Sequence, residues 1–229
     1  MKCFRCGGPH KIAQCPEKPR DSTQSRSSLV TVQEEAPFVF LTENLDQHGL
    51  VIDGTSASPK QAGEEAWLTT TDVVRQGKAV IDGGATQSIG SVHALSQILE
   101  LNEKKRGKDG LADLDMTDRP SFGFGNSSRD RCASTASLSV PMAGKESVLK
   151  VHALDCGEAP VLLSVHSLRK LGAIIDFEAD LAVFRNISDR HVIRLERTTA
   201  GHQVFPLTED AYEQSVKVAQ QVPSLKTYL

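Results

Sequence analysis

The feature that most constrains this chain is a cluster of cysteine and histidine residues at its N-terminus. The pattern is Cys-x2-Cys-x3-His-x4-Cys, and its members are Cys3, Cys6, His10 and Cys15. Three thiolates and one imidazole are the number and kind of ligand that complete a tetrahedral zinc site. Because four protein ligands leave no position for water, we predict one structural Zn²⁺ ion. Its binding would supply the folding free energy of this short segment.

The residues around these ligands indicate a nucleic-acid partner. Five basic side chains and one acidic side chain lie in the first twenty residues: Lys2, Arg5, Lys11, Lys18, Arg20 and Glu17. Gly7 and Gly8 can adopt the backbone angles of a tight turn. On so small a module we expect the side chains of Phe4 and Ile12 to be largely exposed. Exposed apolar groups among cations suit the stacking and phosphate contacts of single-stranded RNA or DNA. The predicted contact residues are Lys2, Phe4, Arg5, Lys11 and Ile12.

The segment resembles the CCHC zinc knuckles of retroviral and retrotransposon Gag proteins over residues 2 to 17. Three residues separate Cys6 from His10 here, where the family usually has four between the second cysteine and the histidine. A chance cluster of cysteines, or a disulfide pair in a secreted fragment, is the alternative. The resemblance implies a zinc-dependent, nucleic-acid-binding module.

Composition limits where the chain acts. The 229 residues carry a net charge of −3, so the basic N-terminus is followed by an acidic remainder. Only Cys132 and Cys156 lie outside the metal cluster, which suits a reducing compartment. No apolar run approaches the ~20 residues of a membrane span, and the first residues of the sequence do not include the apolar region that is typical of a signal peptide. We therefore expect no membrane association and an intracellular location, in the cytoplasm, the nucleus or virus-like particles.

The sequence divides into four regions. Residues 1–18 form the knuckle, 19–65 a flexible linker, 66–196 the main domain, and 197–229 a C-terminal extension with a possible short helix. Within the linker, the two short apolar runs of residues 36–53 are compatible with a pair of strands and with docking on the main domain, and neither role is assigned.

Local patterns in the main domain predict mostly strands. Residues 78–82, 122–126 and 161–163 read as strands, 138–154 as a hairpin, and 173–177 and 181–184 as two final strands. Helices are predicted at 91–102 and 165–171, the second ending at Gly172. The charged residues 103–119 are predicted to form a surface loop.

A second motif follows the first of these strands. Asp82 ends an apolar run and precedes Gly83-Gly84-Ala85-Thr86, so small residues let the chain turn while the carboxylate projects from the sheet. Taken alone, Asp-Gly-Gly is explained first by a plain β-turn.

The order of the surrounding segments resembles the retropepsin-like aspartic protease domain, in particular that of copia-type LTR retrotransposon polyproteins. The matching features are the strand with Asp82, a helix, the Phe-x-Phe-Gly hairpin, and the segments 161–173 and 175–177. The resemblance implies a mostly β fold with minor α, a retropepsin-like (acid protease) β-barrel after the zinc knuckle and linker. It also implies that the chain is a fragment of a Gag-Pol polyprotein.

That family resemblance implies the site residues of an aspartic endopeptidase. Asp82 is the catalytic carboxylate, and a homodimer supplies the second copy, so that the two share one proton. Phe124 and Gly125 belong to the flap over a polypeptide substrate, and residues 161–164 brace the aspartate turn. Gly83 stands where the family usually has Thr or Ser. Ser164 stands where it has glycine, and His166 where an acidic residue is common. These departures leave open a catalytically decayed domain that serves in dimerisation or binding, with nucleic-acid binding as the retained activity.

Other candidate residues have simpler interpretations. We interpret His166 as a partly exposed helix residue, because no Gly-x-Ser-x-Gly elbow accompanies it. Asp176 is interpreted as a structural strand residue, since Phe177-Glu178 follow it. Cys132 and Cys156 are expected to be ordinary core or loop residues. The run 104–106 is expected to be a solvated loop.

Overall fold

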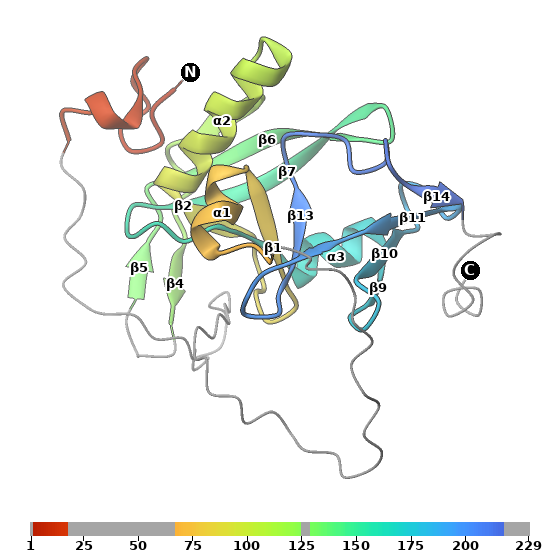
Figure 1. The fold of residues 1–229 in the computed structure, drawn as a ribbon. Helices are drawn as coiled ribbons and strands as arrows, with labels where there is room; N and C mark the ends of the chain where they lie inside the picture. Colours follow the sequence, from red (N-terminus) through yellow and green to blue (C-terminus); the bar gives the residue numbers. More distant parts are fainter. Residues whose placement is uncertain (1, 18–66, 125–128, 218–229) are drawn as a thin grey trace.

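The computed structural model describes residues 2–17, 67–124 and 129–217, which form a mostly β structure, as predicted (Figure 1). The helices are the 3-10 helix η1 (Ile12–Gln14), α1 (Thr70–Arg75), α2 (Val92–Arg106) and α3 (Val165–Leu171). The strands are β1 (Lys78–Asp82), β2 (Ile89–Ser91), β3 (Leu111–Asp115), β4 (Ser121–Gly123), β5 (Arg129–Arg131), β6 (Ser134–Met142), β7 (Lys145–Leu154), β8 (Val161–Ser164), β9 (Ala173–Asp176), β10 (Leu181–Phe184), β11 (His191–Arg194), β12 (Glu196–Arg197), β13 (Gln203–Pro206) and β14 (Val216–Lys217). The predicted linker, with its apolar runs at 36–53, lies outside the described residues.

Eight strands form one mixed sheet in the order β12-β13-β1-β8-β2-β7-β6-β3. β1 runs parallel to β8 and β2 runs parallel to β7, whereas the other pairings are antiparallel. Every residue of β1 and β8 is buried, which explains the apolar runs at 79–81 and 161–163. β3 and β12 are the two edges in the strand order and do not pair with each other. The sheet is therefore open among the described residues, and the expected closed β-barrel is not formed there.

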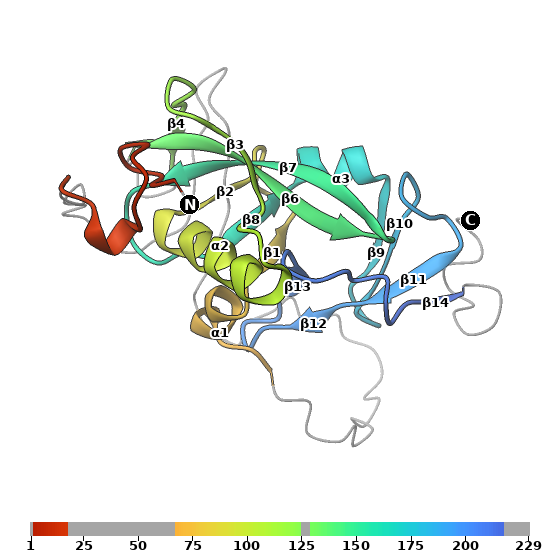
Figure 2. The same ribbon diagram turned by 90° about the horizontal axis from the view of Figure 1, so that it is seen from above.

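The helices cover the sheet and define the main hydrophobic core. α1 and α2 contact each other, and together they contact β1, β2 and β7 (Figure 2). The Ser91 hydroxyl caps α2 by accepting from the amide of Ala94 at 3.0 Å. The helix ends at Gly107, whose φ of 68° is left-handed. The core contains buried residues of α2, of β6 and β7, and of the strands next to them.

The prediction of a surface loop over residues 103–119 is wrong at two segments, one helical and one extended. α2 continues to Arg106, because Lys104, Lys105 and Arg106 stabilise the negative end of the helix dipole. Residues Leu111–Asp115 then form β3 at the edge of the main sheet, where charged side chains are tolerated and hide the strand pattern.

The C-terminal part of the described chain also differs from expectation. β13 lies beyond residue 196, yet it pairs with β1, with Val80 opposite Val204. Residues 211–214 form turns before β14, so the possible short helix is absent from the described part of the extension. β14 joins β11, β10 and β9 in a second, antiparallel sheet.

Candidate functional site

Asp82 lies at the end of β1, in the middle of the main sheet. Its side chain is buried, with 8% of the residue exposed. The amides of Gly84 and Ala85 donate to its Oδ1 at 2.8 and 3.2 Å. The turn after β1 therefore folds around the carboxylate and fixes its position. This agrees with the predicted arrangement of a buried strand followed by a turn of small residues.

The segment predicted to brace this turn lies beside it. β8 pairs with β1 so that Ser164 is opposite Asp82. The amide of Val165 donates to the Ala85 carbonyl at 2.8 Å, which ties the start of α3 to the aspartate turn. The Ser164 side chain also caps α3 by accepting from the amide of Ser167.

One member of this brace, Ser88, was not predicted. Its hydroxyl lies 3.1 Å from Ser164 Oγ and 3.0 Å from Ser167 Oγ, and it accepts from the Ser164 amide at 3.1 Å. Because 76 residues separate Ser88 from Ser164, no local pattern identifies this hydroxyl cluster. It holds β8 and α3 against the segment that follows Asp82.

The predicted flap corresponds to the hairpin formed by β4 and β5. Phe122 is buried in a hydrophobic cluster that also contains Ala85 of the aspartate turn, and Phe124 packs against the same cluster. Gly125 lies outside the described residues. The base of the hairpin is thus anchored in the same apolar cluster as the aspartate turn.

His152 supports this hairpin from β7. Its ring centroid lies 5.6 Å from that of Phe122, and its Nδ1 lies 2.7 Å from Thr135 Oγ1. The Thr135 hydroxyl donates to the Asp118 carbonyl, so it accepts from His152 Nδ1–H. Burial lowers the pKa of His152 below its ordinary value of 6.5, an effect that the charge of Asp118 opposes.

This lowered pKa gives a pH dependence. Since the unfolded chain binds a proton more readily than folded His152, the stability contributed by the neutral ring is complete above about pH 6.5 and is lost as pH falls below it. We expect the free energy of unfolding to fall between about pH 7 and pH 5.5, and to fall less in His152→Asn. Urea unfolding across this range measures it. Equal pH dependence in both proteins would contradict the assignment.

The four predicted metal ligands lie together, although no two are adjacent in sequence. Their ligand atoms all lie within 4.8 Å of one another. Cys6 Sγ is 3.7 Å from Cys15 Sγ and 3.3 Å from His10 Nε2. A tetrahedral zinc ion separates two sulfurs by about 3.8 Å, and a sulfur and a nitrogen by about 3.6 Å. These residues could therefore hold a metal ion, and both donor set and spacing suit zinc.

The turn that brings the ligands together depends on glycine. The amide of Gly7 donates to the Cys3 carbonyl at 2.7 Å, and Gly7 has a φ of +75°, which L side chains rarely adopt. A Cβ on Gly8 would lie 2.7 Å from the His10 ring. Both glycines are thus required for the compact ligand arrangement.

The thiols of the predicted metal ligands differ in acidity. Burial raises the pKa of Cys3 to about 11. Burial also acts to raise the pKa of Cys15, but hydrogen bonds from His10 and from the Glu17 amide outweigh it and lower that pKa to about 7. A bound cation favours the thiolate form of both.

The expectation that Phe4 is exposed is wrong. Only 1% of Phe4 is accessible, and its ring belongs to the main core of the β structure. Arg5 forms two hydrogen bonds with Asp155, at 2.7 and 2.8 Å. Ile12 is half-buried against the same core, whereas it too was expected to be largely exposed. The physical reason is that the segment buries its apolar side chains against the larger domain.

The remaining predicted nucleic-acid contacts are on the outside. Lys2 is exposed, and the Lys11 side chain is 57% exposed while pairing with Glu100 of α2 at 3.0 Å. Of the five predicted contact residues, these two present accessible cations in this arrangement.

The interpretations of His166, Asp176 and the two cysteines fit their positions, whereas the solvated loop expected at 104–106 is not formed. His166 is exposed on α3. Asp176 Oδ1 accepts from the amides of Glu178 and Ala179, within its own turn. Cys132 is buried, and Cys156 is half-buried in the cluster beneath the hairpin. Residues 104–106 are helical, not in a loop.

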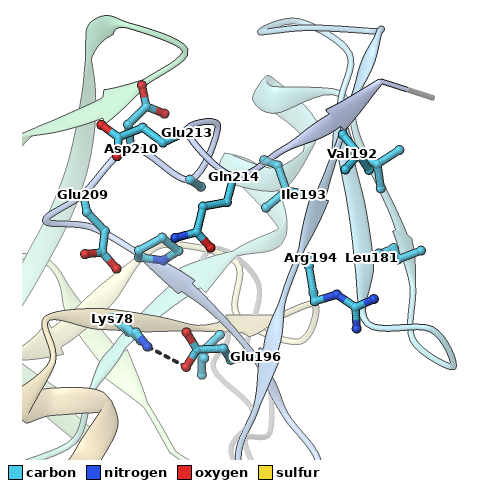
Figure 3. Close-up of a pocket in the computed structure, with 14 residues that line it drawn as sticks. Lys78, Leu181, Val192, Ile193, Arg194, Glu196, Glu209, Asp210, Glu213 and Gln214 are labelled. Atoms are coloured by element: carbon cyan, nitrogen blue, oxygen red, sulfur yellow. Dashed lines mark hydrogen bonds and ion pairs between the residues drawn. The ribbon is translucent and has the colours of Figure 1, made fainter. Parts of the chain in front are cut away.

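A pocket of about 520 Å³ lies elsewhere in the structure, between β1, β10, β11, β12, β13 and the segment 209–216 (Figure 3). Lys78 and Glu196 form an ion pair within it. Glu209, Asp210 and Glu213 add negative charge. Asp82 and the other predicted site residues do not line this pocket.

Among the helices in the described part of the chain, none combines the length and the apolar character of a membrane-spanning helix. Comparison of the chain with protein-family models and with curated proteins finds no match.

Proposed function

We propose that the chain is an aspartic endopeptidase that acts as a homodimer, each subunit contributing Asp82. The observation that carries the proposal is the placement of this carboxylate. It ends a fully buried strand, accepts two backbone amides of its own turn, and lies opposite Ser164 of a bracing parallel strand. A carboxylate held this firmly is suited to proton transfer at a fixed position.

The sequence of elements supports a retropepsin-like site. Strand β1 is followed by the turn, α2, the β4–β5 hairpin, β8 and α3, in the order that the copia-type resemblance requires. The hairpin shares an apolar cluster with the turn, as a flap over the same site would. On this proposal the substrate is an extended polypeptide, such as a polyprotein.

The chemistry requires a second carboxylate. The six residues after Asp82, 83–88, include no acidic side chain, and Asp176 accepts amides of a different turn. Two copies of Asp82 that face each other share one proton, because both cannot ionise at close range. The ionised carboxylate takes a proton from water as the oxygen attacks the scissile carbonyl carbon. The protonated one donates to the carbonyl oxygen, and the C–N bond then breaks as the amine gains a proton.

The experiment is cleavage of an unfolded polypeptide by the full chain. We expect cleavage within about pH 4 to 7, because one of the paired carboxylates must stay protonated, and we expect pepstatin to block it. Absence of cleavage throughout this range, or cleavage that pepstatin leaves unchanged, would contradict the proposal.

A second candidate, a binding or dimerisation module without catalysis, is favoured by Gly83, which offers no hydroxyl beside the aspartate. A Cβ at this position would meet nothing within 4 Å in the subunit, so a side chain fits. If the domain is decayed, Gly83→Thr is expected to produce pepstatin-sensitive cleavage that the parent lacks. Gly83→Ala, which adds bulk without a hydroxyl, is the control. Equal cleavage by parent and both variants would exclude this candidate.

Zinc would have a structural role in the same chain. Cys3, Cys6, His10 and Cys15 would hold it in a closed site, where it supplies no open coordination position for catalysis. Nucleic-acid binding by this segment stays a prediction, supported by the accessible cations Lys2 and Lys11.

A further inference from the structure

The metal-binding segment, residues 2–17, is packed onto the β structure. Phe4 is almost completely buried and belongs to the main hydrophobic core, which also contains residues of α2, β6 and β7. The Ser134 hydroxyl of β6 donates to the Phe4 carbonyl at 2.7 Å, in a buried position. η1 contacts α2, and both views place this segment beside that helix (Figures 1 and 2). The Phe4 ring thus fills space in the domain core.

A buried ion pair fixes the same segment. Arg5 Nε and Nη2 donate to the two carboxylate oxygens of Asp155, and the side chains are only 10% and 6% exposed. This bidentate geometry is specific in distance and orientation. Removing either partner leaves a buried charge without compensation, which is strongly unfavourable. The Gly7 turn also lies close to the β structure, since a Cβ there would be 3.2 Å from the Met116 side chain.

The two side chains that attach the segment to the β structure, Phe4 and Arg5, lie in the sequence between two metal ligands. Phe4 and Arg5 separate Cys3 from Cys6, and the turn that orients them is closed by the Gly7 amide and the Cys3 carbonyl. Fixing so short a turn costs conformational entropy, and without a cation the three thiols gain little from proximity. A metal ion at the four ligands would hold this turn in the docked shape before it meets the domain.

We propose that residues 2–17 are a metal-controlled clamp of the β domain rather than an independent module. Metal binding holds Phe4 in the core and Arg5 on Asp155, and metal loss releases both. Metal occupancy and domain stability are then linked, because a ligand that binds only the docked, folded state stabilises that state. This inference does not depend on the proposed peptidase activity.

The contact between Arg5 and Asp155 also connects the clamp to residues 155–160, which lead from β7 to β8. Asp155 begins the connection from β7 to β8, and the other end is held where the Ser91 hydroxyl and amide donate to the Ala159 carbonyl. Release of Arg5 therefore frees one end of residues 155–160. Loss of metal is expected to raise backbone amide exchange in this segment and in β6.

The test compares the full chain loaded with Zn²⁺ and treated with excess chelator. We expect the chelator to lower the melting temperature of the β domain by on the order of 5–10 °C, and to raise hydrogen exchange at 155–160. In Phe4→Ala and Asp155→Asn, the chelator-induced shift should be less than half as large, since metal acts through these contacts. Co²⁺ absorption confirms that each variant still binds metal.

Phe177→Ala is the matched control, because Phe177 is 62% exposed and lies far in sequence from the four metal ligands. It should retain the full chelator effect. An unchanged melting temperature and unchanged exchange after metal removal would overturn the clamp. So would a chelator shift in metal-binding Phe4→Ala and Asp155→Asn as large as that of the parent chain.

Discussion

Asp82→Asn is expected to lower kcat for polypeptide cleavage by about 10²–10⁴-fold, or to below detection. Asparagine keeps the size of the side chain and an Oδ1 that can accept from the amides of Gly84 and Ala85. It cannot take a proton from water or share one with a second carboxylate. The variant should therefore fold like the parent and lose only the chemical step. Initial rates with an unfolded polypeptide measure it, with melting temperature as the check on folding.

Asp176→Asn is the matched control for this loss. Asp176 also ends a strand, and its Oδ1 also accepts two amides of the following turn, those of Glu178 and Ala179. The two substitutions thus have similar local effects on a turn. Only the one at residue 82 is expected to abolish cleavage. Comparable activity in the two variants would remove Asp82 from the catalytic role.

Phe4→Ala is expected to lower the free energy of unfolding of the zinc-loaded chain by about 3–5 kcal/mol. The truncation removes a ring that is 1% exposed in the main core and leaves a cavity between the N-terminal segment and the domain. For a protein of this size, that corresponds to a fall in melting temperature of roughly 10 °C. Urea unfolding in the presence of Zn²⁺ gives the quantity directly.

The same substitution at an exposed position is the control that separates the loss of core packing from the loss of a phenylalanine as such. Phe177→Ala, at 62% exposure, should change the free energy of unfolding by less than about 0.5 kcal/mol. If Phe4→Ala costs no more than Phe177→Ala, then Phe4 is not part of the core in solution. It would then be available for the stacking role that the sequence first suggested.

Elements with strong local signals were predictable. The apolar run at 161–163, the helix 165–171 and the glycine at 172 match β8, α3 and the left-handed helix end, because each signal lies within a few residues. The ligand set Cys3, Cys6, His10 and Cys15 was predictable for the same reason. The edge strand β3 was missed, since its two aspartates follow a charged, glycine-containing stretch and only a short apolar pattern marks the strand.

The docking of the N-terminal segment could not be predicted from local patterns. Arg5 and Asp155 are 150 residues apart, and Phe4 and Ser134 are 130 apart. A short module with an aromatic residue among cations predicts a nucleic-acid surface when it is considered alone. Only the tertiary structure places the aromatic ring in the core of the β domain. Burial of its apolar surface there lowers the free energy of the folded state more than an exposed position would.

The central claim, that two subunits each contribute Asp82, is tested most directly by mixing wild-type and Asp82→Asn chains at constant total concentration. After subunits have exchanged, a dimer that needs both carboxylates is active only when both chains are wild-type. We therefore expect an equal mixture to retain about one quarter of the wild-type rate. A rate of about one half, in proportion to the wild-type chains after confirmed subunit exchange, would contradict the shared site.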